Sequence, residues 1–314
     1  MAGAPRPQNT KSITSLVFPR TRRAERGASL RRGAEHREGG GGTGRGAVGE
    51  VSPRLDRLGW VVEVPDAERH ALLARDYLAA GRQGRTALVV SPTHKEGDKV
   101  TALIRQELKD AKRIGAFGEG LTALRDLSLT EAETRDGGAY RAGLVVQFFK
   151  DAPGIRKGER LAVEGREGDI VTARKSDGFA VTLPLGLADR YQVYEPYILG
   201  LAAGDWIRVT QNGMSVDGHK LATGNRFEEK GFTPPGATEP TNGWELKREY
   251  GHLAHGYCTT SHASQGKTVD VVLVAQGSDS LPASSQEQFY VSVSRARQGV
   301  RIYTDDKAGL LEAV

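Results

Sequence analysis

The stretch that decides the fold runs from Tyr257 to Thr304. It begins Tyr-Cys-Thr-Thr-Ser-His-Ala-Ser-Gln-Gly-Lys-Thr-Val-Asp-Val-Val-Leu-Val-Ala-Gln and, after a polar connection, continues Gln-Phe-Tyr-Val-Ser-Val-Ser-Arg-Ala-Arg-Gln-Gly-Val-Arg-Ile-Tyr-Thr. Two apolar β-type runs flank one polar loop that contains glycine, and a helical run ending in arginines leads to a further β run. This order predicts strand, loop, strand, helix, strand, which is typical of an α/β fold with a parallel sheet.

Gly266-Lys267-Thr268 looks like the end of a phosphate-binding loop, and that interpretation would make the chain a nucleotide kinase. The motif requires a glycine where this chain has Ser261, and it requires a helix directly after the Lys-Thr pair. Residues 269–274 form an apolar β-branched run instead, which predicts a buried strand. Because a strand cannot present a helix N-terminus to a phosphate, we expect no phosphate-binding loop here. The conformation after Thr268 decides between the two interpretations.

Arg295 and Arg297 follow the predicted helix and are expected near its end. Arginine stays charged, and its planar guanidinium matches phosphate oxygens, so it suits a site where charge develops on a transferring phosphoryl group. A basic helix end that only complements the helix dipole would have the same pattern. The pattern alone leaves both interpretations open.

At these residues the chain resembles a known family. Thr260-Ser-His-Ala-Ser-Gln-Gly-Lys-Thr-Val-Asp270 resembles motif V of the superfamily-1 helicases, and Phe289-Tyr-Val-Ser-Val-Ser-Arg-Ala-Arg297 resembles their motif VI. Both segments are most similar to the helicase half of the MobF-type conjugative relaxases, RecD-like proteins that nick and then unwind plasmid DNA. Two long motifs in the family's order make a specific signal, and the resemblance runs from about Leu58 to the C-terminus.

The resemblance implies the second of two RecA-like domains: a parallel sheet with flanking helices, interrupted by a β-rich insertion. It implies DNA contacts for Thr93, His94, Thr260, Ser261 and His262. It implies nucleotide contacts for Gln265, Gly266, Lys267, Arg297 and Arg105, and it makes Arg295 the catalytic arginine that reaches the γ-phosphate. One loop that touches both DNA and nucleotide would couple hydrolysis to strand movement. The ribose-contacting glutamate of some relatives is Thr268 here, so the ribose contact stays open.

In this family, ATP with Mg²⁺ lies between two RecA-like domains, and its hydrolysis drives movement along single-stranded DNA. The other domain carries the phosphate-binding loop (Walker A) and the acidic Mg²⁺-binding motif (Walker B), and neither is found in this sequence. We therefore expect the Mg²⁺ ligands to come from an N-terminal helicase or relaxase portion, as a separate chain, and the isolated chain to hydrolyse ATP poorly. The alternative is a non-catalytic module that binds single-stranded DNA or a relaxase subunit.

The composition fits one large or two modest domains in the cytoplasm. The chain has 314 residues, of which 38% are hydrophobic, enough to form a core. The single cysteine, Cys258, excludes an internal disulfide, which agrees with a reducing compartment. No apolar run approaches the roughly 18 residues of a membrane span. Residues 13–18 are too few for the apolar core of a signal peptide.

The positive charge is concentrated in the N-terminal tail. Residues 1–50 hold ten Lys/Arg and four Asp/Glu, a balance of +6, so the remainder holds 34 against 35, a balance of −1. Ten glycines and little periodic apolar sequence predict that this tail is disordered. Composition favours a solvated extension or the remnant of a truncated gene over a basic arm that contacts phosphates.

Residues 51–142 are expected to form the first part of the RecA-like domain. The patterns predict a strand at 60–64, a helix at 66–80, a strand at 86–90 and a helix at 95–111. The predicted apolar face of the last helix consists of Val100, Leu103, Ile104 and Leu108. Alternating strands and helices predict parallel pairing, which places the returning helices over the sheet.

Ser91-Pro-Thr-His94 follows a predicted strand, at the carboxyl edge where open α/β sheets bind ligands. A hydroxyl and backbone N–H groups at a helix start suit a phosphate, although Ser91 or Thr93 could equally serve as a helix cap. We expect Arg295 at this same carboxyl edge. Arg105, on the following helix, corresponds to the arginine of family motif IV or is a solvated helix residue.

Residues 143–250 change to short β-type runs separated by turn residues such as Asp177-Gly178. They predict a β-rich insertion with a small barrel, similar to the Src-homology-type barrel that covers DNA in RecD-like helicases; a structural or protein-docking barrel is the alternative. Tyr191, Tyr194 and Tyr197 could stack on bases, but burial in the barrel is the more common role. The RecA-like domain is expected to resume at 251–314.

Two further expectations concern the end of this insertion. Residues 225–243 contain Pro234-Pro235 and are expected to form a loop. His252 and His255 lack a third ligand pattern, so we expect no metal site there.

Overall fold

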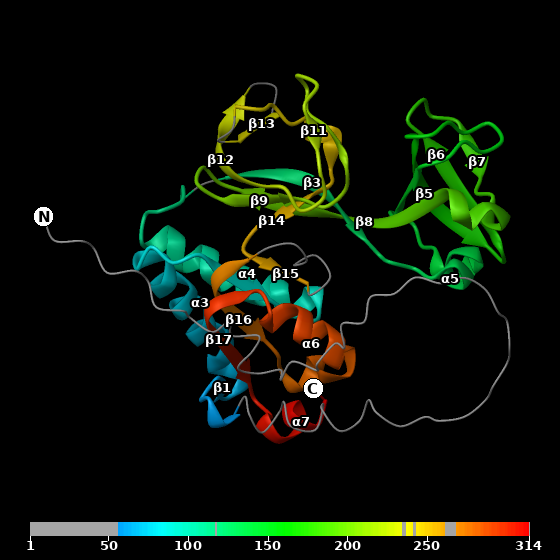
Figure 1. The fold of residues 1–314 in the computed structure, drawn as a ribbon. Coiled ribbons are helices and arrows are strands. Elements are labelled where there is room, and N and C mark those ends of the chain that lie inside the picture. Colours follow the sequence, from blue (N-terminus) through cyan, green and yellow to red (C-terminus); the bar gives the residue numbers. More distant parts are fainter. Residues whose placement is uncertain (1–55, 117, 234–236, 241–242, 261–267, 314) are drawn as a thin grey trace, which may run out of the picture. The chain divides into compact units, whose positions relative to one another are not determined.

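The computed structural model describes residues 56–116, 118–233, 237–240, 243–260 and 268–313. The predicted disorder of residues 1–50 falls outside this part of the chain. The chain divides into two compact units (Figure 1). One consists of the residues up to Ala111 together with those from Tyr257 onward, and we call it the parallel-sheet unit. The other is Lys112–Gly256, the β-rich unit.

All five strands of the parallel-sheet unit run in the same direction. Their order is β1 (Val61–Glu63), β17 (Ala296–Thr304), β16 (Val269–Ala275), β2 (Ala87–Val90) and β15 (Cys258–Thr259). In the middle of the sheet, Val272 of β16 lies between Leu88 of β2 and Val300 of β17. The strand predicted directly after Thr268 is confirmed. Since no helix follows Thr268, a phosphate-binding loop ending there is excluded.

Helices return the chain between the parallel strands, as this pairing requires. The helix α3 (Asp66–Arg82) joins β1 to β2, and η5 (Ser278–Ala283) with α6 (Gln286–Val293) joins β16 to β17. The helix α4 (His94–Asp110) follows β2, and α7 (Lys307–Ala313) follows β17 (Figure 1). The predicted elements of residues 60–111 are thus confirmed to within two residues at each end.

The core of the parallel-sheet unit follows from the alternation of side chains along each strand. Leu88, Val90, Val272 and Val274 point to one face, where they pack with Phe289 and Val293 of α6 and Leu310 of α7. Intervening residues such as Val89 and Leu273 are also buried. On α4, Val100, Ile104 and Leu108 are buried at four-residue spacing, as predicted, but Leu103 is 37% exposed. The buried stripe of α4 is therefore narrower than predicted.

The β-rich unit contains antiparallel sheets and short helical turns. The larger sheet has the order β3 (Glu119–Asp126), β8 (Tyr191–Leu201), β4 (Val145–Phe148), β5 (Arg160–Glu167), β6 (Ile170–Lys175), β7 (Ala180–Thr182). The second has the order β13 (Ala237–Pro240), β12 (Arg226–Thr233), β9 (Trp206–Val209), β14 (Leu253–His255), and β10 (Gly213–Met214) pairs with β11 (Lys220–Leu221). The turns are α5 (Glu131–Arg135), η1 (Gly137–Ala139), η2 (Leu185–Arg190) and η3 (Arg248–Tyr250).

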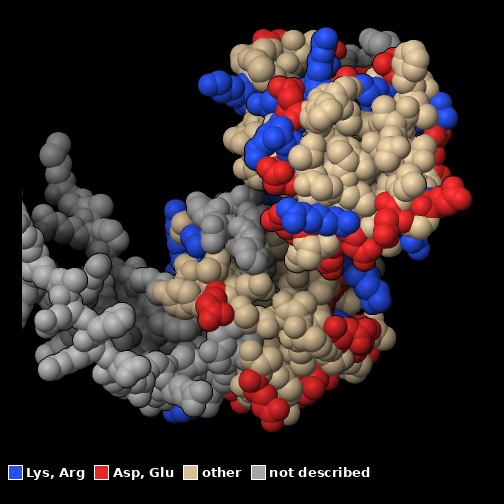
Figure 2. Space-filling model, turned by 90° about the vertical axis from the view of Figure 1, so that its right-hand side faces the viewer, with Lys and Arg blue, Asp and Glu red and all other residues tan. Residues whose placement is uncertain are grey.

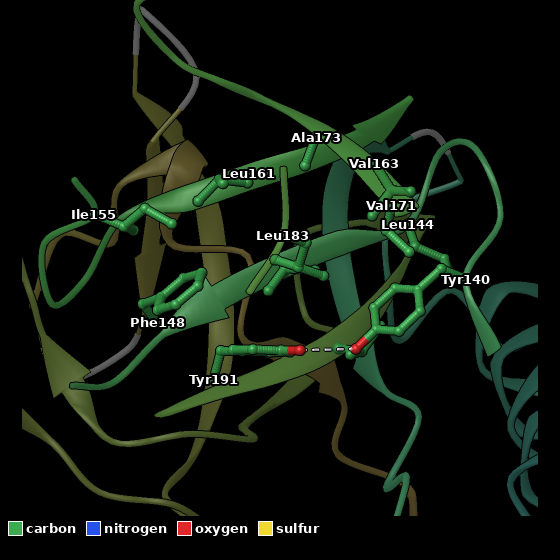
Figure 3. Close-up of a cluster of buried hydrophobic side chains, with 12 residues drawn as sticks. Tyr140, Leu144, Phe148, Ile155, Leu161, Val163, Val171, Ala173, Leu183 and Tyr191 are labelled. Carbon is green, nitrogen blue, oxygen red and sulfur yellow. Dashed lines mark hydrogen bonds between the residues drawn. The ribbon is translucent and has the colours of Figure 1, made fainter. Parts of the chain in front are cut away.

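Strands β4 to β7 and the start of β8 surround one buried cluster (Figure 3). The strand order from β3 to β7 is that of an open sheet among the described residues, so the small barrel stays a prediction. The largest members of the cluster are Phe148, Tyr140 and Tyr191. The hydroxyls of the two tyrosines lie 3.1 Å apart, and that of Tyr140 also donates to the carbonyl oxygen of Thr134 at 2.6 Å. The buried polar atoms of both rings are therefore satisfied.

A second cluster fills the other half of the β-rich unit. It combines residues from β3, the end of β8, β9 and β14: Leu121, Ala123, Leu199, Leu201, Ile207, Val209 and Leu253, with Leu221 and Leu246. Tyr191 and Tyr194 are buried. Tyr197 is half-buried, with the Arg125 guanidinium 4.8 Å from its ring centre. The interpretation of these tyrosines as mostly core residues is confirmed.

Two expectations about this unit differ from the structure. The unit begins at Lys112 rather than at residue 143, because β3 pairs with β8 along its whole length, from Glu119↔Leu201 to Asp126↔Tyr194. Residues 225–243 are not a simple loop, because β12 pairs with β9 on one side and with β13 on the other. Strand β3 is stabilised by a partner distant in sequence, and β12 by β9 in addition to its hairpin partner β13; short-range turn signals reveal neither the β3–β8 nor the β9–β12 pairing.

Charges of both signs are interspersed on the face of the β-rich unit in Figure 2, around a broad uncharged area. This agrees with the near-zero charge balance of the sequence after residue 50. No helix in the described residues is long and apolar enough to cross a membrane.

Candidate functional site

The predicted site residues of the parallel-sheet unit divide between two edges of one sheet. Thr93 and His94 follow the carboxyl end of β2, and Thr260 follows the carboxyl end of β15. Arg295 precedes the first residue of β17, and Arg297 is its second residue. Because all five strands are parallel, the three described residues predicted to contact DNA, Thr93, His94 and Thr260, lie at the carboxyl edge and these two arginines lie at the amino edge.

The prediction that Arg295 lies at the carboxyl edge is wrong. The helix α6 carries the chain from the end of β16 back toward the start of β17, so a residue directly after α6 must lie at the amino edge. The two arginines also do not share the helix end: α6 ends at Val293, Arg295 lies in the turn, and Arg297 is in the strand. A helix-dipole role for Arg297 is therefore ruled out.

Thr93 is held by a compact turn at the carboxyl edge. Its side-chain oxygen accepts a hydrogen bond from the backbone N–H of Glu96 at 3.3 Å, so it caps α4. The Ser91 hydroxyl donates to the carbonyl oxygen of Thr93 at 3.0 Å, and the backbone N–H of Ser91 donates to the carbonyl oxygen of Thr259. The capping hydroxyl of Thr93 still has its own hydrogen to donate. His94 is exposed and Thr260 is half-buried.

A buried ionic group lies directly behind this turn. Arg69 of α3 donates to Glu96, and also to Asp66 at 2.6 Å. Burial alone would raise the pKa of Glu96, but favourable interactions with His70, Arg69 and Ser280 outweigh burial and lower that pKa to about 2; of these three, Arg69 donates a hydrogen bond and the His70 ring nitrogen lies 3.5 Å away. Glu96 is therefore ionised at neutral pH, although its side chain is almost completely buried.

Arg295 is anchored at the amino edge through its backbone and one side-chain nitrogen. Its carbonyl oxygen accepts from the N–H of Val269 at 3.0 Å, and its Nε donates to the carbonyl oxygen of Val291 at 3.1 Å. Its two Nη groups have no partner among the described residues. A half-buried guanidinium with unpartnered Nη groups is suited to bind phosphate oxygens.

Asp270 organises the amino edge around these arginines. Its carboxylate accepts from the N–H and the hydroxyl of Thr86 at 2.9 and 2.8 Å, and from the Gln298 amide at 3.3 Å. The hydrogen bonds from Thr86, with smaller contributions from the charges of Arg297 and Arg85, hold the pKa of Asp270 below its usual value. The carboxylate thus ties the starts of β2, β16 and β17 together.

Several predicted residues lie outside the described part of the chain: Ser261, His262, Gln265, Gly266 and Lys267. Their flanking residues are described. Thr260 follows the carboxyl end of β15, and Thr268 precedes the amino end of β16. The segment 261–267 therefore joins the two edges of the sheet, whatever its own conformation.

Arg105 lies in the second half of α4 and is half-buried. The helix α4 starts at the carboxyl edge, so its second half points toward the amino edge, where Arg295 lies. That Arg105 contacts the nucleotide stays a prediction.

Sequence analysis missed Asp270 as an organiser and missed the Arg69–Glu96 pair. The spacing Thr93-x-x-Glu96 is a helix-start signal that could have been found, but it predicts a capping role for the glutamate. No local signal connects Glu96 to Arg69 or Asp270 to Thr86, because each pair is far apart in the sequence.

Among the described residues, no group of three or more His, Cys, Asp and Glu side chains is placed to hold a metal ion. His252 is buried with its Nε2 2.7 Å from the Gln147 side-chain oxygen, and the His255 Nε2 lies 2.9 Å from the carbonyl oxygen of Gly200. That Mg²⁺ ligands come from another polypeptide segment stays a prediction.

Comparison with known proteins gives a consistent set of relatives. A family model described as the viral superfamily 1 RNA helicase core domain matches residues 214–304, which include both segments that resemble helicase motifs. Two proteins described as the multifunctional conjugation protein TraI, from Escherichia coli and its strain K12, are each 21% identical, over 257 and 268 residues. Each alignment covers 77% of this chain but only 14% of the relative, so the chain spans a small part of the curated relatives' length.

Similar solved structures are helicases of the Pif1 group. A Bacteroides Pif1 bound to single-stranded DNA is 15% identical with a TM-score of 0.25, and the match covers 84% of this chain and 47% of that one. The Pif1 helicase from Candida albicans is 17% identical with a TM-score of 0.24, covering 79% and 51%. Such low TM-scores do not establish how the units of this chain are arranged. On its motifs and its sequence matches, the chain is a relative of the superfamily-1 helicases and resembles the second RecA-like domain of a relaxase–helicase.

Proposed function

We propose that this chain is the C-terminal motor domain of a conjugative relaxase–helicase, acting in the cytoplasm on single-stranded DNA with ATP during plasmid transfer. One observation carries the proposal: Thr93 and Thr260 lie at one edge of the parallel sheet, Arg295 lies at the other, and the segment 261–267 joins the two edges. Hydrolysis of a nucleotide bound near Arg295 can thus shift the groups that bind DNA near Thr260, because one short segment connects the two places.

The carboxyl edge has the groups that a DNA backbone requires. The hydroxyl hydrogen of Thr93, the exposed ring of His94 and backbone N–H groups at the start of α4 can donate to phosphate oxygens. Such contacts carry no base information, which suits a protein that moves along DNA regardless of sequence.

The amino edge has groups that fit the phosphates of ATP. The Nη groups of Arg295, which have no partner among the described residues, can stabilise charge on the γ-phosphoryl group during hydrolysis, a contribution worth roughly 10³ to 10⁵ in rate where an arginine is supplied to such a site. Arg297 is exposed two residues further along the chain, in β17, and can meet the same polyphosphate. Bound Mg²⁺ would neutralise charge on the phosphates, and in our proposal its ligands and the phosphate-binding loop belong to the other RecA-like domain.

The test compares ATP hydrolysis by the pure chain and by its mixture with an N-terminal RecA-like domain from a relaxase–helicase, with and without oligothymidylate. We expect no DNA-stimulated hydrolysis by the pure chain and stimulated hydrolysis by the mixture, lost with Arg295→Ala. Rapid hydrolysis by the pure chain would contradict an incomplete motor.

Fluorescence anisotropy with labelled oligothymidylate tests the DNA edge separately. We expect binding without ATP that weakens as the salt concentration rises. Binding in this assay with no hydrolysis in any mixture would identify the chain as the alternative, a non-catalytic DNA-binding module. Absence of binding under low salt would contradict both.

A further inference from the structure

A buried ionic cluster lies behind the DNA-facing edge of the parallel-sheet unit. The side chains of Arg69 and Glu96 are paired, and the two residues are only 3% and 6% exposed. Arg69 also pairs with Asp66, and its Nε lies 3.7 Å from a carboxylate oxygen of Asp305. An ion pair buried to this degree strongly favours one arrangement, because separating the partners would leave a charge without water.

The cluster connects segments that leave three different strands. Glu96 follows β2, and its Oε1 accepts from the backbone N–H of Gly277, which follows β16, at 3.1 Å. Asp305 follows β17 and accepts from the N–H of Ser278 at 2.8 Å. Three connections at the carboxyl edge are thereby held to one another and, through Arg69, to α3.

Gly277 is required by the close approach of Arg69. A methyl group added at this glycine would lie about 2.7 Å from the guanidinium carbon Cζ of Arg69 and closer still to Nη2. Its backbone does not require glycine, since its φ is −84°. Glycine at position 277 therefore lets the Arg69 guanidinium pack directly against the backbone, and a larger residue would displace it.

The role of Glu96 goes beyond helix capping. The spacing Thr-x-x-Glu also occurs at Thr130–Glu133, and there the glutamate reaches back to accept from the N–H of its own cap residue at 2.8 Å. Glu96 has the same spacing from Thr93, but its carboxylate instead accepts from Arg69 and Gly277. The same sequence pattern thus has two roles. At α5 the glutamate caps the N-terminus of its own helix, and at α4 it links the helix start to other connections at the carboxyl edge of the sheet.

Glu96 is hydrogen-bonded to Thr93, one of the residues predicted to contact DNA. The N–H of Glu96 donates to the side chain of Thr93, and the N–H of Gly97 donates to the Thr93 carbonyl oxygen at 3.1 Å. We propose that Arg69, Glu96 and Gly277 are positioning residues, which hold the first turn of α4, with Thr93 and His94, in place for binding a nucleic-acid backbone. The DNA part of this inference rests on the proposed function, whereas the fastening of the α4 start does not.

The test uses Gly277→Ala and Glu96→Gln, with Asp76→Asn as the matched control. Asp76 lies on the same helix as Arg69 and accepts hydrogen bonds from Arg301 and Tyr303, so its loss disturbs the same unit without touching the cluster. All variants are assayed as the full chain, at temperatures equally far below their own melting temperatures. Two quantities are measured: hydrogen exchange at the amides of Glu96 and Gly97, and the affinity for labelled oligothymidylate.

We expect both cluster variants to speed exchange at these two amides and to weaken oligothymidylate binding about tenfold, equivalent to roughly 1.4 kcal/mol of binding free energy. Asp76→Asn should change neither quantity. Exchange at Glu96 and Gly97 that matches the control would overturn the positioning role. Faster exchange with unchanged affinity would overturn the link to DNA. If the unaltered chain binds no oligothymidylate, the proposed function fails, while the exchange measurement still decides whether the cluster fastens α4.

Discussion

The backbone N–H of Val269 donates a hydrogen bond to the carbonyl oxygen of Arg295, with an N–O distance of 3.0 Å. Val269 begins β16 directly after Thr268, and Arg295 ends the turn before β17. This bond makes the arginine part of the sheet rather than of a free loop. The backbone of Arg295 is thereby fixed at the start of β16, the strand to which the chain connects after β15 ends at the carboxyl edge.

Thr93 is predicted to act twice, as a helix cap and as a phosphate donor. Thr93→Ala should lower the free energy of unfolding by about 1 kcal/mol because the N–H of Glu96 loses its acceptor. It should also weaken oligothymidylate binding without changing the steepness of its salt dependence, because a neutral hydroxyl displaces no counterion. Urea titration and fluorescence anisotropy measure the two effects.

Thr93→Ser is the matched control, since it keeps the hydroxyl and removes only a methyl group. We expect nearly unaltered stability and DNA affinity for this variant. An affinity loss equal to that of Thr93→Ala would show that the hydroxyl is not the group that matters.

We predict that the Asp270 carboxylate stabilises the amino edge of the sheet by accepting hydrogen bonds from Thr86 and Gln298. Asp270→Ala removes the oxygen that accepts from both the N–H and the hydroxyl of Thr86. We expect a lower melting temperature, by about 2 to 4 °C, and weaker stimulation of ATP hydrolysis in the mixture with the other motor domain. Scanning calorimetry measures the first effect. An unchanged melting temperature would mean that the contacts with Thr86 do not stabilise the fold.

Acid should destabilise the parallel-sheet unit through Glu96. Its pKa is about 2 in the folded chain against an ordinary value of 4.5, so the folded state favours the ionised form. The resulting stability, about 2 to 3 kcal/mol, is present above pH 4.5 and is lost as the pH falls from there toward 2. Urea titrations followed by helical circular dichroism should show this loss, because α3, α4, α6 and α7 belong to this unit. In Glu96→Gln this part of the acid dependence should be absent.

His252 should make the β-rich unit sensitive to milder acid. Burial, with a smaller contribution from the charge of Arg160, lowers its pKa from 6.5 to about 4. The folded state therefore favours the neutral ring: the stability is complete above pH 6.5 and is lost as the pH falls toward 4, by about 1 to 2 kcal/mol. In a Trp60→Phe background, the fluorescence of Trp206 and Trp244 reports on this unit alone. A pH dependence that persists in His252→Gln would assign the effect to another group.

Local patterns predicted most of the parallel-sheet unit. The apolar run after Thr268 became β16, and the helix predicted after Ser91-Pro-Thr-His94 became α4. These elements have strong periodicity and bury one or both faces, so local sequence and tertiary packing favour the same structure. The strands of residues 225–243 were missed because β12 is stabilised by pairing with β9 rather than by its own pattern.

The sequence by itself determined which residues are candidates for the chemistry: the two helicase-like segments, the arginines that follow α6, and the hydroxyls after β2 and β15. Only the tertiary structure decided which edge each group occupies. Parallel pairing places a residue after a returning helix at the amino edge, so Arg295 lies opposite Thr93 and Thr260. It also decided that Glu96 pairs with Arg69 and Asp270 with Thr86, because such contacts depend on strand order and helix packing, which no short stretch of sequence encodes.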